Sequence, residues 1–445
     1  MANLNHLFKK DNDYYIVDGE NLSIYKIPKT INDKLDNFSS DELHLYESKM
    51  ITKPRETFEI VDSNKRSTCR RLIIILSNYC NLACKYCYAN GGNYENNNLD
   101  NMSLETLKKS IETVLSIYPD GIEYIQFFGG EPLINKNVMV DGIEFINNYF
   151  RIKGIKAPKY TIVTNGILID DDIIEIFNKY FSSVTISLDG EKSINDKSRV
   201  FKTNVVESAS VYDKVIEKIE LINNKKRSFS LSLEITVTPY HIDSFINEGT
   251  INSISCLRKL DVDVFQVSPV FHRDNKEYQF SNQESVKLFF DKWVIESFNS
   301  LSKKKGKYVN VGNILKAFSK KCYNGNNCGA VKSDIAIDVN GDMYPCFMFI
   351  GHEKFKIANS YNFNIEKYNT NRNKIIKELT QANDNIKCSN CWAKKLCSDS
   401  YGHCIGARYL LNGSINEPIN LACEIGKTVI ERTIVKTIDY FGMRK

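Results

Sequence analysis

Short hydrophobic runs alternate with amphipathic segments between Arg71 and about Pro269. Six runs rich in β-branched and aromatic residues predict strands, and they are LIIILSN, EYIQFFGG, KYTIVTNG, SVTISLDG, LSLEITVTP and VDVFQVSPV. Stretches of helical periodicity separate some of them, namely SLETLKKSIETVLSIY, DDDIIEIFNKYF and YDKVIEKIELINN. Repeated strand–helix units predict a parallel sheet with right-handed crossovers, so the fold class is α/β.

Different patterns flank this region. On the N-terminal side, the stretches YYIVDG and LSIY predict a hairpin around an Asp-Gly turn, and a helical TINDKLDNF follows. From about Lys320 onward, cysteines cluster, glycine and asparagine become more frequent, and strand signals shorten. We therefore expect a small module over residues 1–65, an α/β core over 66–300, and bridging helices with a cysteine-rich domain over 301–445.

Composition and charge narrow the class of protein. With 445 residues and 42% hydrophobic content, the chain is long enough for two or three packed domains. The formal net charge of +5 is small and no long basic block occurs, so no nucleic-acid partner is expected. The longest aliphatic run, Leu72–Leu76, is too short to cross a bilayer, and the N-terminus has no apolar core of signal-peptide length. We expect a cytoplasmic protein without a membrane partner.

Three of the thirteen cysteines share one short loop, CNLACKYCY. In a reducing compartment cysteines are better candidates for metal ligands than for disulfides. The loop follows the first predicted strand, at the end where β/α barrels build their active sites. If Cys80, Cys84 and Cys87 bind three corners of a 4Fe-4S cluster, its fourth iron is open to an added ligand. A zinc site completed by a distant residue is the alternative, although structural zinc loops usually use pairs of ligands.

This loop resembles that of the radical S-adenosylmethionine (SAM) enzymes, whose CxxxCxxC motif has an aromatic residue, here Tyr86, before the last cysteine. Further segments agree with the family in order along the chain. Gly129-Gly130-Glu131-Pro132 matches its GGEP segment after the second strand, and Thr164-Asn165-Gly166 and Ser187-Leu188-Asp189-Gly190 match the strand ends that contact the ribose. Asp196-Lys197-Ser198-Arg199 matches a DxxR segment whose arginine can pair with the cofactor carboxylate.

The resemblance implies a partial (β/α)6 barrel over roughly residues 68–270. It implies that a reductant such as flavodoxin or ferredoxin delivers an electron to the cluster, and that bound SAM then yields methionine and a 5′-deoxyadenosyl radical, which takes hydrogen from a carbon atom. No catalytic side chain is assigned. The cofactor-binding residues implied by the resemblance are Tyr86, Gly129, Gly130, Glu131, Asn165, Ser187 and Arg199.

Eight further cysteines lie downstream, enough for two sites of four thiolates. Cys388, Cys391 and Cys397 alone could form a zinc ribbon. The whole set resembles a SPASM domain, which implies a first auxiliary 4Fe-4S cluster on Cys322, Cys328, Cys346 and Cys404 and a second on Cys388, Cys391, Cys397 and Cys423. Six residues separate Cys397 from Cys404 where the family usually has three. The expected cofactors are SAM and three 4Fe-4S clusters, one of which binds SAM.

The residue directly after Cys346 bears on the class of substrate. In the sulfatase-maturing branch an acidic base is expected directly after the cysteine that corresponds to Cys346, and here that residue is Phe347. The N-terminal hairpin and helix are compatible with a reduced winged-helix element that binds a precursor peptide as an added strand, or with a structural cap on the barrel.

We therefore interpret the chain as a maturase that installs a crosslink in a cysteine-containing, ribosomally made precursor peptide (a RiPP). The expected bond is a thioether from a cysteine sulfur to a carbon, as in sactipeptides or ranthipeptides. The alternatives are a SPASM enzyme that forms a carbon–carbon crosslink or oxidises a protein side chain and, in another class, a non-catalytic zinc or iron–sulfur binding protein.

Overall fold

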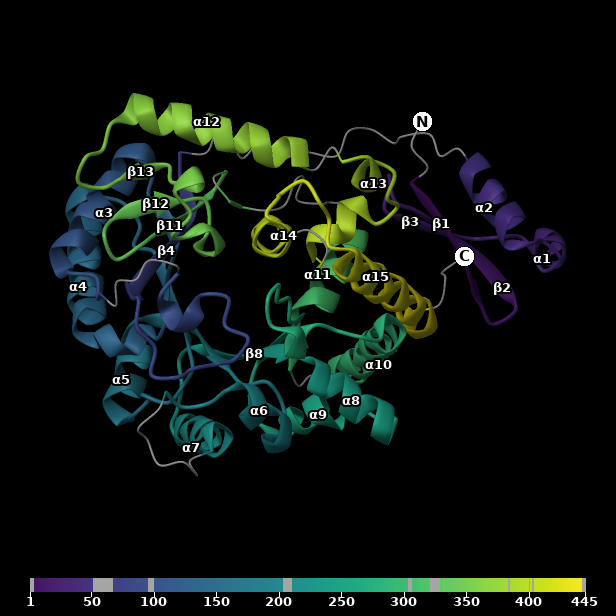
Figure 1. The fold of residues 1–445 in the computed structure, drawn as a ribbon, viewed down its shortest axis with the longest axis horizontal. Coiled ribbons are helices and arrows are strands. Elements are labelled where there is room, and N and C mark those ends of the chain that lie inside the picture. The colour runs from purple at the N-terminus through teal and green to yellow at the C-terminus, as the bar shows by residue number, and fades with distance from the viewer. Residues whose placement is uncertain are drawn as a thin grey trace.

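The computed structural model describes residues 4–50, 67–94, 100–202, 210–302, 306–320, 329–330, 332–382, 385–399, 401 and 404–441. Its centre is a row of six parallel strands, each hydrogen-bonded to the next (Figure 1). They are β4 (Cys69–Ser77), β5 (Ile122–Gly129), β6 (Lys159–Thr164), β7 (Phe181–Ser187), β8 (Ser230–Val237) and β9 (Val264–Pro269). The six predicted hydrophobic runs lie on these strands, and the predicted α/β fold with a parallel sheet is confirmed.

The sheet is larger than the predicted six strands. Beyond β9 it continues with β10 (Lys307–Tyr308), which pairs parallel to β9. Beyond β4 it continues with β11 (Asp334–Ile337), β12 (Asp342–Tyr344) and β13 (Ala358–Asn359). Because β11 pairs parallel to β4, the segment that presents Cys346 belongs to the same sheet as the cysteine loop.

Helices cover one face of the six-stranded row. They are α3 (Leu104–Ile117), α4 (Lys136–Lys153), α5 (Asp171–Tyr180), α6 (Lys192–Ser198), α7 (Val211–Asn223), α8 (Pro239–Glu248) and α9 (Asn252–Ser255). Ser103, Asp170 and Ser210 each cap a helix by accepting a backbone N–H of its first turn. Helix α4 was not predicted, because asparagines and Gly142 interrupt its apolar positions, yet Met139, Ile143 and Ile146 are fully buried.

The two faces of the parallel row differ sharply in polarity. Val184 and Ile186 on β7, with Leu233 and Ile235 on β8, have no exposed surface and pack on the helix side. Side chains alternate along a strand, so their neighbours point to the other face. That inner face carries Thr185, Ser187, Glu234, Thr236 and Gln266, all partly or largely accessible. The face opposite the helices, called the lumen below, is therefore polar and solvent-accessible.

The N-terminal module is a three-stranded antiparallel sheet with two helices. Its elements are β1 (Asn5–Lys10), β2 (Asp13–Asp18), β3 (Ser23–Lys26), α1 (Lys29–Leu35) and α2 (Ser40–Lys49). The hairpin of β2 and β3 was predicted, whereas β1 and α2 were not. One face of the sheet packs its apolar residues against the two helices, and Phe8, Tyr15 and Val17 on the other face join the main core.

This module contacts the C-terminal, cysteine-rich part of the chain. The His6 ring stacks on the Trp392 ring at 4.2 Å and 7°. The ammonium group of Lys395 donates to the Glu20 carbonyl at 2.6 Å and to its carboxylate at 2.7 Å. Figure 1 shows the module beside α13 (Ile386–Ser389) and α15 (Asn420–Phe441).

The other helices of the C-terminal part are α10 (Gln283–Ser302), α11 (Val309–Lys320), α12 (Ile365–Ala382) and α14 (Ile405–Asn412).

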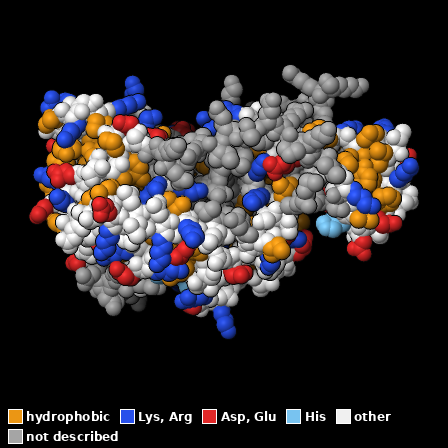
Figure 2. Space-filling model, turned by 90° about the horizontal axis from the view of Figure 1, so that it is seen from above, with side chains coloured by type: hydrophobic (Ala, Val, Ile, Leu, Met, Phe, Trp, Pro, Cys, Tyr) orange, Lys and Arg blue, Asp and Glu red, His pale blue; other side chains and the backbone are white. Residues whose placement is uncertain are grey.

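The outer surface mixes both signs of charge. On the face shown in Figure 2, basic and acidic side chains are interspersed. Within the described ranges, no helix has the length and apolar character needed to cross a membrane.

Candidate cofactor site

The cysteine loop leaves the end of β4 and is fixed by backbone hydrogen bonds. Ala83 N–H donates to the Val200 carbonyl at 2.8 Å, and Lys85 N–H to the Ser198 carbonyl at 2.9 Å. The sulfurs also accept from backbone: Leu82 N–H lies 3.4 Å from Cys80 Sγ, and Gly91 N–H 3.4 Å from Cys87 Sγ. Such donors stabilise thiolates that ligate a metal.

The three thiols lie close enough to influence one another. The pKa of Cys80 is raised to about 12, mainly by burial. The Glu131 carboxylate contributes to this increase, and the thiols of Cys84 and Cys87 add smaller contributions. Burial also raises the pKa of Cys84 to about 11. In the absence of bound metal Cys80 and Cys84 are therefore neutral thiols, and cluster binding must displace their protons.

The arrangement fits an iron–sulfur cluster better than a zinc ion. In the parts of the chain that the structure describes, no three His, Cys, Asp or Glu side chains converge tightly enough to hold one metal ion. A tetrahedral zinc requires that convergence, with every sulfur about 2.3 Å from the same atom. In a 4Fe-4S cluster each thiolate binds a different iron, so the sulfurs stand farther apart.

Glycines bring the end of β5 against the cysteine loop. A Cβ on Gly130 would lie 2.3 Å from the Tyr79 carbonyl oxygen, and one on Gly92 would lie 2.6 Å from the Gly130 Cα. Gly129 has φ +142° and would place a Cβ 2.4 Å from the Ser77 oxygen. Gly130 N–H donates to that oxygen at 2.8 Å. These contacts form a tight backbone cradle beside the three cysteines.

Replacing Gly130 with alanine should disrupt this cradle. Because the added methyl group meets the backbone of Tyr79 rather than a movable side chain, we expect the loop to shift, with a loss of about 1–3 kcal/mol of stability. The loss in free energy of SAM binding should be larger than the loss in free energy of unfolding. Calorimetric unfolding and equilibrium binding of SAM check this. Gly312→Ala on α11 is the control, because an added Cβ there meets no atom within 4 Å and its φ is not positive. Unchanged SAM binding by Gly130→Ala would contradict the role of the cradle.

Glu131 ties three strand ends together. Its carboxylate is fully buried and accepts from Leu133 N–H at 3.0 Å, Thr164 Oγ1 at 2.8 Å and Asn165 N–H at 2.8 Å. Burial raises the pKa of Glu131, and these donors lower it. Asn165 in turn donates through Nδ2 to Asn81 at 2.7 Å and lies 3.6 Å from Cys80 Sγ. The GGEP segment, the TNG segment and the cysteine loop therefore form one hydrogen-bonded unit.

Arg199 forms the positive centre of the site. It is 6% exposed, and its Nη1 donates to the Tyr86 hydroxyl at 2.8 Å. That hydroxyl donates to Asp189 Oδ2 at 2.5 Å, and Arg199 Nη1 lies 4.0 Å from Asp189 Oδ1. The buried Nε of Arg199 has no partner among the described residues. A buried guanidinium with an unused donor is suited to a carboxylate ligand.

The structure therefore brings together most of the predicted cofactor-binding residues, with Ser187 at the last position of β7. It also adds an aromatic row that the sequence did not predict. The Phe347 ring lies 4.8 Å from Phe128, which precedes Gly129, and 6.0 Å from Tyr88, which follows Cys87. Tyr88 is 39% exposed, yet burial raises its pKa well above the ordinary value. The exposed fraction places Tyr88 at the border of solvent-accessible space.

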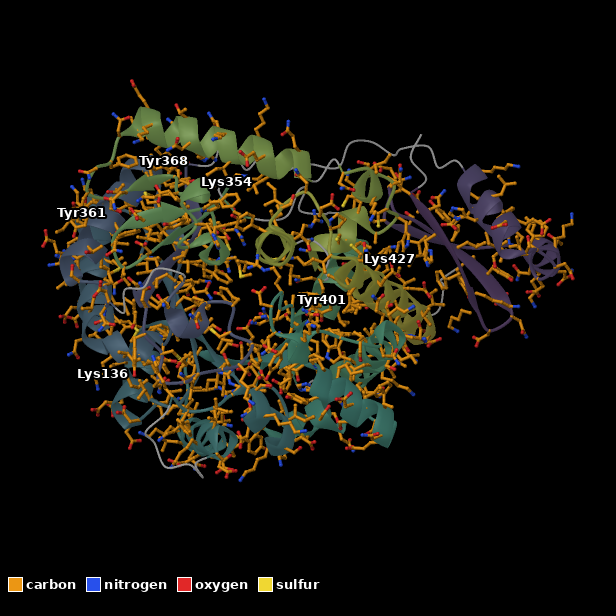
Figure 3. The ribbon with its side chains drawn as sticks, viewed as in Figure 1. Lys136, Lys354, Tyr361, Tyr368, Tyr401 and Lys427 are labelled. Carbon is orange, nitrogen blue, oxygen red and sulfur yellow. The ribbon has the colours of Figure 1, made fainter. Side chains whose placement is uncertain are left out.

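Of the two predicted sets of downstream cysteines, the structure describes one completely. Burial raises the pKa of Cys397 to about 12, and the thiols of Cys423, Cys391 and Cys388 raise it further, so these four lie together. Arg408 Nη2 lies 3.8 Å from Cys388 Sγ. Lys427, labelled in Figure 3 on α15, interacts electrostatically with Cys391 and Cys423.

The other predicted set is described only in part. Cys346 lies near Tyr88 and Tyr94, and Cys404 begins α14, where its sulfur accepts from Ala407 N–H at 3.4 Å. Cys322 and Cys328 lie outside the described residues. This ligand set stays a prediction.

Comparison with known proteins agrees with the geometry of the cysteine loop. Residues 74–246 match the model of the radical SAM superfamily. The chain is a radical SAM enzyme, so its cofactors include SAM and one 4Fe-4S cluster. It is related to anaerobic sulfatase-maturating enzymes and to maturases of ribosomally made peptides.

Three relatives illustrate the extent of the similarity. The chain is 26% identical over 380 residues to the cysteine-type anaerobic sulfatase-maturating enzyme of Clostridium novyi, covering 82% of this chain and 95% of that protein. It is 25% identical over 385 residues to the radical SAM cyclopropyl synthase TigE of Paramaledivibacter caminithermalis, covering 83% and 74%. A 133-residue stretch, 30% of the chain, is 38% identical to the uncharacterized protein MJ0907 of Methanocaldococcus jannaschii but spans only 43% of that protein.

Two solved structures share the fold. Native anSMEcpe with bound AdoMet superposes with a TM-score of 0.65 at 18% identity, covering 83% of this chain and 98% of that one. Streptococcus suis SuiB bound to precursor peptide SuiA superposes with a TM-score of 0.51 at 15% identity, covering 94% and 97%.

Proposed function

We propose that this enzyme is a peptide maturase that installs a thioether crosslink between a cysteine sulfur and a carbon atom of a ribosomally made precursor. One observation carries the proposal: Phe347, directly after Cys346, packs on Phe128 and Tyr88 beside the cysteine loop. An aromatic wall at this place provides no base for side-chain oxidation. It favours a reaction in which the substrate thiol loses its proton and its sulfur bonds to the carbon from which a hydrogen atom has been removed. One electron leaves with that hydrogen atom, and the second passes to an auxiliary cluster.

The chain's residues divide the work around the bound cofactors. Cys80, Cys84 and Cys87 hold the cluster. The close contacts of Gly129 and Gly130 with the backbone of Ser77 and Tyr79 fix the strand end at which the methionine end of SAM binds. Arg199, with its unused Nε, pairs with the cofactor carboxylate. When bound, the cluster and SAM supply a radical that removes one hydrogen atom from the substrate. Tyr88, Phe128 and Phe347 exclude water from the substrate residue.

The C-terminal part is proposed as a SPASM domain with two auxiliary 4Fe-4S clusters. The grouping of Cys388, Cys391, Cys397 and Cys423 supports a second auxiliary cluster. Arg408 and Lys427 beside these sulfurs stabilise the negative charge of four thiolates. Because thioether formation removes two electrons from the peptide, such a cluster has a role as electron acceptor.

The N-terminal module is proposed to bind the leader part of the precursor. The sheet of β1, β2 and β3 offers strand edges for an added strand. SuiB, which shares the fold, was solved with its precursor peptide SuiA. A reductant such as flavodoxin or ferredoxin is proposed as the electron donor.

A second candidate is oxidation of a protein side chain. The similarity to a cysteine-type sulfatase-maturating enzyme along 95% of that enzyme's length favours it. Phe347 in place of an acidic residue disfavours it. A carbon–carbon crosslink is the third possible outcome of the same chemistry.

Mass spectrometry separates these outcomes. The reconstituted enzyme is incubated without oxygen with SAM, a reductant and a candidate cysteine-bearing precursor peptide. A thioether predicts loss of two hydrogen atoms and a cysteine that no longer reacts with iodoacetamide. The same mass loss with a reactive cysteine would indicate a carbon–carbon crosslink. Exchange of the sulfur for oxygen together with loss of two hydrogen atoms would indicate side-chain oxidation to an aldehyde. Either result would overturn the proposal.

A further inference from the structure

A carboxylate in the barrel lumen has no assigned role. Glu234 lies in the middle of β8, and strand register places it between Ser187 on β7 and Gln266 on β9. Side chains of residues in register point to the same face of a sheet. The flanking residues Leu233 and Ile235 have no exposed surface and face the helices, so Glu234 points into the polar lumen.

The surroundings of Glu234 are those of a binding group. Within the part of the chain that the structure describes, its carboxylate accepts no hydrogen bond, although Arg199 and Asp189 are near enough to act on it electrostatically. Burial raises the pKa of Glu234, Arg199 lowers it and Asp189 raises it. Because this face is accessible to solvent, water can donate to the Glu234 carboxylate, and a ligand with hydroxyl donors can replace that water.

Asp189, the other carboxylate at this end of the sheet, is already occupied. Its Oδ1 accepts from Thr236 N–H at 3.1 Å, and its Oδ2 accepts from the Tyr86 hydroxyl at 2.5 Å. Each Asp189 oxygen therefore already has one donor, whereas neither Glu234 oxygen has one among the described residues. A carboxylate that receives two hydroxyl donors from one ribose is a recurrent arrangement in nucleotide-binding sites.

We propose that Glu234 is a further cofactor-binding residue that accepts hydrogen bonds from the ribose hydroxyls of SAM. The strand register supports this proposal. Ser187, the last residue of β7, pairs with Glu234, and the ribose is expected at that end of β7. The inference rests on SAM as cofactor and not on the type of crosslink. It can therefore fail or succeed independently of the thioether proposal.

A binding cycle tests the assignment without any precursor or reductant. Equilibrium affinities of the cluster-loaded protein are measured for S-adenosylhomocysteine and for its 2′,3′-dideoxy analogue. Glu234→Ala should weaken binding of S-adenosylhomocysteine about tenfold to hundredfold and leave the affinity for the dideoxy analogue unchanged. Glu234→Gln, which keeps one acceptor oxygen, should lose less.

Two measurements separate this role from a structural one. Iron content and the cluster spectrum of Glu234→Ala should equal those of the parent. Glu220→Ala, on the exposed side of α7, serves as the matched carboxylate control and should bind both ligands as the parent does. Equal affinity of parent and Glu234→Ala for S-adenosylhomocysteine would overturn the proposal. So would equal losses for both ligands, because the effect would then not involve the hydroxyls.

Discussion

Replacing Cys80, Cys84 and Cys87 together with alanine should abolish formation of 5′-deoxyadenosine. The three sulfurs share one loop, and Cys80 lies near enough to Cys84 and Cys87 for both to act on it electrostatically, so we expect them to act as one binding unit. Without them the SAM-binding cluster has no protein ligands, and the protein should contain about four fewer iron atoms per chain. Iron and sulfide analysis, with chromatography of the nucleoside products under anaerobic reduction, measures both effects.

A matched thiol control accompanies this experiment. Cys256 lies in a short helical segment far along the sequence from the loop, with its sulfur 3.8 Å from the Ser253 carbonyl. Cys256→Ala should keep the full iron content and the full rate of SAM cleavage. If the triple variant still forms 5′-deoxyadenosine, the assignment of the cysteine loop is wrong.

The sequence predicted the sheet because its signal is local and repeated. Each central strand is a hydrophobic run followed by a polar or glycine-containing turn, and hydrophobic burial on the helix side selects those runs. Helix α4 and strand β1 were missed for a physical reason. In α4 four buried apolar side chains are spaced among asparagines and a glycine, and in β1 the run NHLFKK has only two strongly apolar residues. Tertiary packing decides both elements.

The site was predictable where chemistry is fixed by residue type and spacing. The cysteine triplet and the GGEP, TNG and DxxR segments each stand out in the printed sequence. Glu131 was placed among cofactor-binding residues, but its three hydrogen bonds show that it joins strand ends to one another. Neither the contact of Phe347 with Phe128 nor the position of Glu234 beside Ser187 could be predicted, because both depend on pairing between distant segments.

The electrostatic balance of the site links its stability to its function. Arg199 is the cation among Asp189, Glu131 and Glu234, each of which it influences or contacts. Folding therefore buries this charge before any ligand arrives. Pairing with Asp189 and with the Tyr86 hydroxyl offsets part of the desolvation cost. The unused Nε retains capacity for the cofactor carboxylate, so part of the compensation is supplied only on binding.

Replacing Arg199 with alanine should accordingly damage both stability and SAM binding. Loss of one partner leaves the buried Asp189 without its cation and near Glu234, which costs about 3–5 kcal/mol of unfolding free energy. SAM affinity should fall at least about a hundredfold, because a buried charged hydrogen bond to the carboxylate is lost as well. Arg199→Lys, which keeps the charge without the planar group, should recover more of the stability than of the affinity.

A double variant separates the two effects. Arg199→Ala with Asp189→Asn removes the unpaired negative charge and should recover a large part of the lost stability in denaturant unfolding, because the pair is then absent as a whole. SAM affinity should stay low, since no group replaces the guanidinium. Arg273→Ala, which breaks a highly exposed pair with Asp274, is the control and should change neither quantity measurably. Recovery of SAM affinity in the double variant would show that Arg199 acts only through folding and does not bind the cofactor.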